Sequence, residues 1–275
     1  MSPFGLDPRF VASGLLGGFA IGLTGMGGGA ILTPLLLALG VPPSTAIGSD
    51  LIASIVMKPV AGSVHARAKT VRWDLVRWLT VGSVPAAFVG VAASRLLTRH
   101  GDAGLRRAIG LALIVAATAI VVRTIRLRRQ ASADRDRGPS AGKSTGESTV
   151  ESAPMAPVRR LPTVVIGVVG GFLVGLTSVG SGSLMLVALA ILYPRLASAE
   201  LVGTDVVQAV PLVGAAALGH VLIGDFKAGL TLALLLGGIP GAYVGARLSS
   251  GSATRFVRPA LLTVLVASAT KLIIA

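Results

Sequence analysis

The stretch GFAIGLTGMGGG, residues 18–29, is apolar apart from one threonine and ends with four glycines in five residues. A matching stretch, GFLVGLTSVGSG, follows at 171–182. The apolar segments that contain them, 9–39 and 161–192, exceed the roughly 17–25 residues of a simple membrane-spanning helix. Glycine favours unwound backbone, which a membrane tolerates only where it is buried or lines a polar cavity. We therefore expect both segments to break, or to re-enter the membrane, at their glycines.

The composition predicts an all-α polytopic membrane protein. Hydrophobic residues make up 53% of the chain and charged residues only 13%, well below the roughly 25% charged residues of a soluble domain. Apolar stretches long enough to cross a bilayer recur along most of the sequence. The remaining predicted segments are 44–64, 76–97, 105–122, 200–222, 228–248 and 256–274.

These segments form two homologous repeats of about four each, because a shift of about 155 residues superimposes rare residues in order. Internal duplication is typical of secondary transporters, whose substrate site lies where the repeats meet. The sequence leaves open whether the repeats are parallel or inverted. The matched residues are Gly48-Ser49-Asp50 with Gly203-Thr204-Asp205, His65 with His220, Pro85 with Pro240, and Gly90 with Gly245.

We divide the chain into an N-terminal transmembrane repeat at 1–122, a linker at 123–160 and a C-terminal transmembrane repeat at 161–275. The linker is basic and rich in Ser, Gly, Pro and Ala, so we expect it to be disordered and cytoplasmic. Its GKST run at 142–145 is not a phosphate-binding loop, because that pattern requires a glycine where Arg137 stands.

The net charge of +14 comes from basic residues in the loops and the linker. Such residues keep to the cytoplasmic side and attract anionic lipid headgroups, so we expect membrane lipids as partners and no nucleic acid. The chain contains no cysteine, which excludes disulfides and thiolate metal sites. We expect a multi-pass protein of the cell (inner or plasma) membrane with no metal and no cofactor, and a homo-oligomer is compatible with the sequence.

The glycine breaks are the first candidate substrate site. A helix that resumes after a break, near Ala30 or Ser183, presents free N–H groups and the positive end of its dipole to an anion. The alternative is that the glycines only allow helices to pack closely. The candidate substrate-binding residues are Gly25, Gly27, Gly28, Gly29, Lys58, Ser178, Gly180, Ser181, Gly182 and Ser183.

Ionisable residues inside the spans are few and costly, so they are expected to face a cavity or a partner. Asp50, Lys58 and His65 lie within about 80° of one another on a helix, and Asp205 and His220 repeat the Asp and His positions. Lys58 can neutralise Asp50 or meet the substrate. The Asp and His residues are candidates for proton coupling; helix capping by the aspartates, and interfacial anchoring by the histidines, are the structural alternatives.

The motifs together resemble the sulfite exporter TauE/SafE family, integral membrane proteins proposed to move sulfite and organosulfonate-type anions. The resemblance covers both halves and implies transport of a small anion, but it assigns no set of transport residues. It rests on GLTGMGGGAILTPLLLALGV from Gly22, AIGSDL from Ala46, VHARAKTVRWDLV from Val64, GSVPAAFVG from Gly82, VGTDVV from Val202, GHVLIGDFKAG from Gly219 and GGIPGAYVGARL from Gly237.

The sequence thus predicts a secondary transporter, an exporter or permease, of sulfite or an organosulfur anion, with proton coupling through the Asp and His residues. Two alternatives remain open: an anion channel and a membrane assembly subunit. An intramembrane enzyme is disfavoured, because the spans lack Cys, Glu and a close His-Glu metal spacing.

Overall fold

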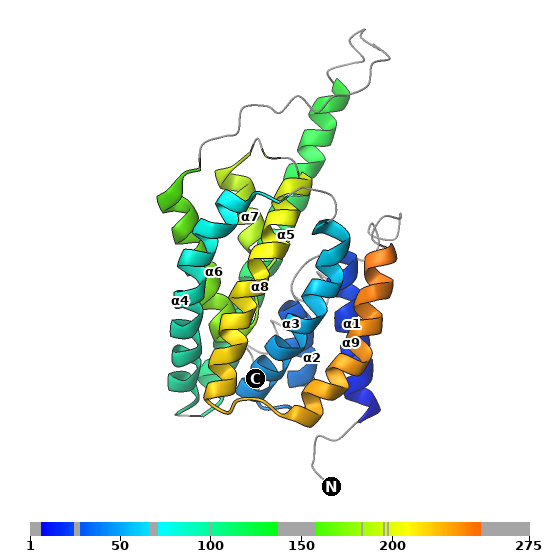
Figure 1. Ribbon diagram of the computed structural model, residues 1–275, viewed down its shortest axis with the longest axis vertical. Helices are drawn as coiled ribbons and strands as arrows, with labels where there is room; N and C mark the ends of the chain where they lie inside the picture. Colours follow the sequence, from blue (N-terminus) through cyan, green and yellow to red (C-terminus); the bar gives the residue numbers. More distant parts are fainter. Residues whose placement is uncertain are drawn as a thin grey trace.

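The computed structural model describes residues 7–24, 28–66, 71–99, 101–136, 158–182, 184–194, 196 and 198–248. Within these residues the chain is helical and has no β-strand, which confirms the predicted all-α class (Figure 1). The elements are α1 (Pro8–Thr24), η1 (Gly28–Ala30), α2 (Leu32–Ala38), α3 (Pro43–Ala66), α4 (Trp73–Thr98), α5 (Ala103–Asp136), α6 (Arg160–Thr177), α7 (Leu184–Leu192), α8 (Ser198–Leu222) and α9 (Ala228–Leu248).

Both long apolar segments break where their glycines predict. The segment 9–39 forms α1, the short 3-10 helix η1 and α2, and the segment 161–192 forms α6 and α7. Segments 44–64, 76–97, 200–222 and 228–248 correspond to α3, α4, α8 and α9, and 105–122 lies within α5. The last predicted segment, 256–274, lies outside the described residues.

Helix α1 packs against α9 through glycines one helical turn apart. A side chain added at any of these glycines would collide with the α9 backbone, so the two helices approach as closely as backbones allow. The numbers rise together along both helices, so α1 and α9 run parallel. The contacting pairs are Gly14 with Leu234, Gly18 with Gly238, and Gly22 with Ala242.

Helix α6 packs against α4 in the same parallel way. Each residue of this interface is the counterpart, in the other half of the sequence, of a residue between α1 and α9. The first helix of each half therefore packs on the fourth helix of the other half. The contacting pairs are Gly167 with Leu79, Gly171 with Ser83, and Gly175 with Ala87.

Helices α3 and α8 lie at the centre, between the α1–α9 and α4–α6 pairs (Figure 1). Two matched hydrogen bonds fix their directions: the N–H of Lys227 donates to Ser49 Oγ at 3.3 Å, and the N–H of Arg72 donates to Thr204 Oγ1 at 3.1 Å. The N-terminal part of each helix thus lies beside the residues that follow the other. Because α3 and α8 are counterparts, their antiparallel packing means that the halves have inverted, not parallel, orientation.

Helix α5 differs from expectation. It continues to Asp136, so the prediction of a disordered linker from residue 123 onward is wrong for 123–136. The residues 123–136 are mostly good helix formers such as Arg, Leu, Ala and Gln, and the first glycine and proline come at 138 and 139. Residues 137–157 lie outside the described residues.

The outer faces of the bundle are apolar. Among the described residues, four helices are long and apolar enough to cross a membrane: α4, α6, α8 from Glu200, and α9. Large apolar side chains such as Leu16, Val168 and Leu236 are exposed on α1, α6 and α9. An exterior of this kind suits contact with lipid chains, whereas polar side chains such as Asp50, Ser54 and Lys58 are buried inside the bundle.

Candidate substrate site at the two helix breaks

The break between α6 and α7 is built by residues with positive φ. Helix α6 ends at Thr177, and Ser178 adopts a left-handed conformation with φ of 60°. Gly180 and Gly182 follow with φ of 116° and 113°, a backbone region that side chains disfavour. These glycines are therefore required by the backbone turn itself, which close helix packing alone does not explain.

The two breaks touch each other. A Cβ added to Gly29, in η1, would lie 1.9 Å from the carbonyl oxygen of Ser178 and 2.6 Å from its Oγ. At Gly29 the glycine is thus needed for close approach, as the packing alternative proposed. Gly28 begins η1, while Gly25, Gly27 and Ser183 lie outside the described residues.

Asp50 lies inside α3, fully buried, and accepts three hydrogen bonds from hydroxyl groups. Thr33 Oγ1 donates to its Oδ2 at 2.9 Å, Ser178 Oγ donates to Oδ2 at 2.8 Å, and Ser54 Oγ donates to Oδ1 at 3.2 Å. Its carboxylate joins α2, α3 and the α6–α7 break. Capping is wrong for Asp50 and for Asp205, since α3 begins at Pro43 and α8 at Ser198, well before either residue.

Lys58 lies two turns further along α3 and is 6% exposed. Its Nζ donates to Ser181 Oγ at 2.8 Å, so this ammonium group also reaches the break between α6 and α7. The carboxylates of Asp205 and Asp50, one from each half, both act electrostatically on it. The structure therefore brings together Asp50, Lys58, Ser178 and Ser181, all predicted as site residues.

The two halves differ around their matched aspartates. Asp205 is buried in α8 at 1% exposure, like Asp50 in α3. The positions that match the polar neighbours of Asp50, however, are apolar. They are Leu186 for Thr33, Ala209 for Ser54, and Val213 for Lys58. The polar site is thus asymmetric and combines α2 and α3 of one half with the break of the other.

The histidines are not brought to this site as far as the structure describes them. His220 is fully buried; its Nε2 lies 3.0 Å from the carbonyl oxygen of Gly175, and its Nδ1 lies 3.5 Å from Asp225 Oδ2. A buried ring that bridges α8 and α6 is not an interfacial anchor, so that alternative is wrong for His220. His65 belongs to α3, but its side chain lies outside the described residues.

Two buried polar residues near the aspartates were not predicted. Thr33 could have been noticed as a lone hydroxyl in an apolar run of the first repeat. Gln208 stands three residues after Asp205 in α8; its Nε2 donates to Ser83 Oγ at 2.8 Å, and its Oε1 has no hydrogen-bond partner among the described residues. A buried amide beside a buried carboxylate is the signal that could have found it.

Comparison with known proteins identifies the family. The family model for the sulfite exporter TauE/SafE matches residues 10–272. The probable membrane transporter protein YjnA of Bacillus subtilis (strain 168) is 36% identical over 271 residues, which cover 98% of this chain and 100% of that protein. YunE of the same organism, also named a probable membrane transporter protein, is 25% identical, covering 87% of this chain and 86% of that protein.

No solved structure matches the chain. The family match spans both halves and agrees with the all-helical bundle and its apolar exterior. The chain therefore belongs to the sulfite exporter TauE/SafE family of membrane transporters.

Proposed function

We propose that this membrane transporter is a secondary carrier of a small anion, sulfite or an organosulfur anion. The observation that supports this most is the buried Lys58 ammonium group beside the meeting point of the two helix breaks, hydrogen-bonded to Ser181 at 2.8 Å. A buried ammonium in a medium of low dielectric attracts an anion far more strongly than the same charge in water. A buried cation in a membrane span is also a candidate functional group by default.

The substrate position in this proposal lies beside Lys58 Nζ and the Ser181 hydroxyl, which are hydrogen-bonded to each other at 2.8 Å. An oxyanion would accept hydrogen bonds from Lys58 Nζ and from the Ser181 hydroxyl. The turn with positive φ at Gly180 and Gly182 keeps the neighbouring backbone free of side chains. Inverted repeats with broken helices that meet at the centre are the arrangement in which carriers expose one site alternately to each side.

The coupling step in this proposal is protonation of Asp205. Asp205 is buried in α8 and its carboxylate acts electrostatically on Lys58, so a proton on Asp205 leaves more of the positive charge of Lys58 available to the anion. Of the two aspartates, Asp50 has a structural role, because it accepts hydrogen bonds from three hydroxyl groups that come from α2, α3 and the α6–α7 break.

We place the protein in the cell membrane with the linker side facing the cytoplasm. The end of α5 contains Arg123, Arg126, Arg128 and Arg129, and α6 begins just after Arg159. Arginines concentrated at this side satisfy the positive-inside rule. Helix α1 then begins on the opposite, outer side, because the halves are inverted.

The experiment that tests the proposal is counterflow in proteoliposomes of the purified chain. Vesicles preloaded with unlabelled sulfite should accumulate labelled sulfite transiently and with saturation, and an excess of an organosulfonate should compete. Conductance far above the turnover of a carrier would instead identify a channel. Absence of both counterflow and conductance with every oxyanion offered would contradict anion transport.

A further inference from the structure

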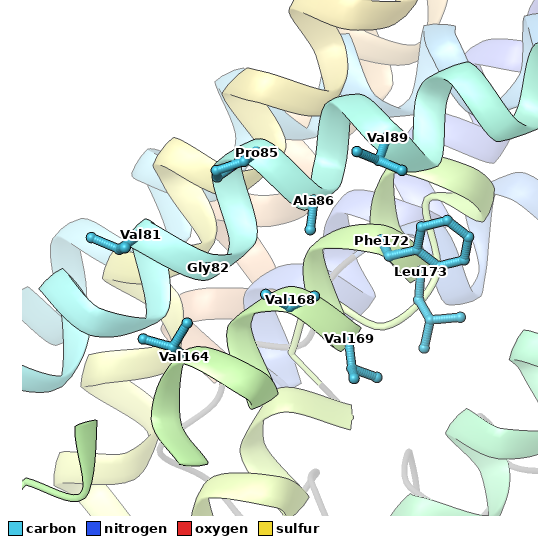
Figure 2. A pocket seen from close by; sticks show the side chains of 10 residues that line it. All are labelled: Val81, Gly82, Pro85, Ala86, Val89, Val164, Val168, Val169, Phe172 and Leu173. Atoms are coloured by element: carbon cyan, nitrogen blue, oxygen red, sulfur yellow. The ribbon is translucent and has the colours of Figure 1, made fainter. Parts of the chain in front are cut away.

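An apolar groove runs along the outer face of the bundle between α4 and α6. Figure 2 shows the side chains that line it, including Val81, Pro85 and Val89 of α4 and Val164, Val168 and Phe172 of α6. It encloses a volume of about 570 Å³, and no charged side chain lines it. The lining residues recur every fourth position, so the groove follows the axes of both helices.

The groove has about the length of one lipid leaflet. From Val81 to Val89 the helix rises roughly 12 Å, at about 1.5 Å per residue. Half of a hydrocarbon core of about 30 Å is roughly 15 Å. An apolar groove of this length suits one acyl chain.

Basic and aromatic side chains lie at one end of the groove. Arg77 precedes Val81 by one helical turn, and Arg160 precedes Val164 by one turn, so both extend the rows of side chains that line the groove. Both arginines are exposed. The guanidinium carbon of Arg160 lies 5.3 Å from the ring centroid of Trp78, which orients the side chain at this end.

This end belongs to the linker side of the molecule, since α4 and α6 run parallel and α6 follows the linker directly. In the orientation proposed above, it faces the cytoplasmic leaflet, where anionic lipids attract basic residues beside a membrane span. The basic end of the groove therefore suits the headgroup of an anionic phospholipid, and the apolar lining of the rest suits its acyl chain.

The matching face between α1 and α9 lacks this headgroup end. The counterpart of Arg160 is Asp7, that of Arg77 is Leu232, and that of Trp78 is Ala233. The apolar rows are retained there, with Leu15 at the position of Val168. Arg9 and Lys227 lie near the starts of α1 and α9, but at positions other than those of Arg160 and Arg77. Basic residues that extend both lining rows are thus confined to one of two otherwise similar faces, so general lipid solvation of a helix pair does not explain them.

We propose that the α4–α6 groove is a binding site for one anionic phospholipid of the cytoplasmic leaflet. Its phosphate is held by Arg77 and Arg160, and one acyl chain lies along Val81, Val89, Val164 and Val168. The proposal uses the orientation proposed above but no property of the transported anion, so either can fail without the other.

The test uses the full chain in phosphatidylcholine nanodiscs that contain a small fraction of one photoreactive lipid. This lipid carries a diazirine on its acyl chain and has either a phosphatidylglycerol or a phosphatidylcholine headgroup. Labelled peptides are then mapped by mass spectrometry. Phosphatidylglycerol should label α4 and α6 in preference to phosphatidylcholine, and α1 and α9 should show no such preference.

The variants Arg77→Gln and Arg160→Gln should each reduce the preference by about fivefold, the effect expected for one basic residue near the surface. Arg247→Gln is the matched control, because it removes an exposed arginine that stacks on Tyr243 at the end of α9. It should leave the preference at α4–α6 unchanged. Equal labelling of α4–α6 by the two lipids would overturn the proposal. So would disulfide-linked dimers of a Val168→Cys variant, because a second copy would then occupy the groove.

Discussion

At the scale of single residues, the site depends on how Asp50 is surrounded. Three buried hydroxyl groups donate to its two oxygens, and they come from α2, α3 and the second helix break. Leaving buried donors without an acceptor costs about 1–3 kcal/mol for each group. The carboxylate therefore stabilises the meeting point of the two halves, besides any effect of its charge on Lys58.

We predict that Asp50→Ala lowers stability much more than Asp50→Asn. The amide oxygen of asparagine can still accept from the hydroxyls, whereas alanine removes every acceptor and costs roughly 1–3 kcal/mol or more. Thermal unfolding of the purified variants in detergent measures the difference. Equal melting temperatures for the two variants would show that the hydroxyl groups do not depend on Asp50.

We predict that Asp205→Asn separates binding from coupling. The variant should still exchange anions by counterflow, since Lys58 and Ser181 are retained. It should no longer accumulate the anion when a pH gradient is imposed, because the group that takes the proton is absent. Accumulation driven by the pH gradient at the wild-type level would contradict the role of Asp205. Thr118→Ala, at an exposed residue of α5 whose hydroxyl donates to Ile114 of the same helix, is the control and should leave both counterflow and accumulation unchanged.

At the scale of elements, the helix pairs depend on glycine contacts that leave no space for a side chain. A Cβ at Gly18 would lie 2.1 Å from the carbonyl oxygen of Gly238. Any side chain there must push α1 away from α9, and overpacking of this kind costs about 1–3 kcal/mol.

We therefore predict that Gly18→Val lowers the melting temperature and the yield of inserted protein. Ala12→Val adds a valine on the exposed face of the same helix and should leave both unchanged. Unfolding in detergent and the amount of protein in membranes are the measurements. An unaffected Gly18→Val protein would show that the close contact between α1 and α9 is not needed.

We predict that the sequence between α5 and α6 is dispensable for transport. Residues 137–157 contain few apolar residues to pack against the bundle. Replacing them with a Gly/Ser sequence of equal length should leave flux intact, and α5 is kept whole because the replacement begins after Asp136. Loss of flux in a normally inserted protein would contradict this prediction and would show that residues 137–157 have a role in transport or its regulation.

The sequence predicted both helix breaks from their glycines, and the structure gives the physical reasons. Gly180 and Gly182 have positive φ, which side chains disfavour, and Gly29 has no space for a side chain beside Ser178. It also grouped Lys58 with the serines of the second break, and Lys58 does contact Ser181. It did not predict that Asp50 contacts Ser178 of the same break. It could not predict the extent of α5, because composition alone does not separate a basic helix from a basic linker. Thr33 was missed, because its partner Asp50 comes from another helix.

At the scale of the whole molecule, the sequence left parallel and inverted repeats open, and the matched contacts decide between them. Ser49 and Thr204 are counterparts. Each accepts a hydrogen bond from the N–H of the residue that directly precedes the fourth helix of the other half, Lys227 before α9 and Arg72 before α4. These two hydrogen bonds place the start of α3 beside the end of α8 and the start of α8 beside the end of α3, so the two helices are antiparallel. Hydrophobic patterns identify spans but not their pairing, so the sequence alone had no means of choosing.

We predict that the start of α1 and the end of α5 lie on opposite sides of the membrane. The natural chain has no cysteine, so single introduced cysteines can be labelled without background. A membrane-impermeant maleimide should label Ser2→Cys in intact cells and should label Ser132→Cys only after the cells are permeabilised. Labelling of both positions in intact cells would contradict the inverted arrangement.

The central claim is that Lys58 binds the anion, and the most direct test is sulfite binding by purified Lys58→Met, Lys58→Arg and Lys58→Met/Asp205→Asn proteins. Loss of one hydrogen bond to a charged group, about 1.5–3 kcal/mol, predicts at least about a tenfold weaker affinity for Lys58→Met. Lys58→Arg should keep part of the affinity, because the charge remains in an altered geometry. The double variant should stay weak, because removing the carboxylate does not replace the cation. Wild-type affinity in the double variant would contradict the account, because Lys58 would then serve only to neutralise Asp205.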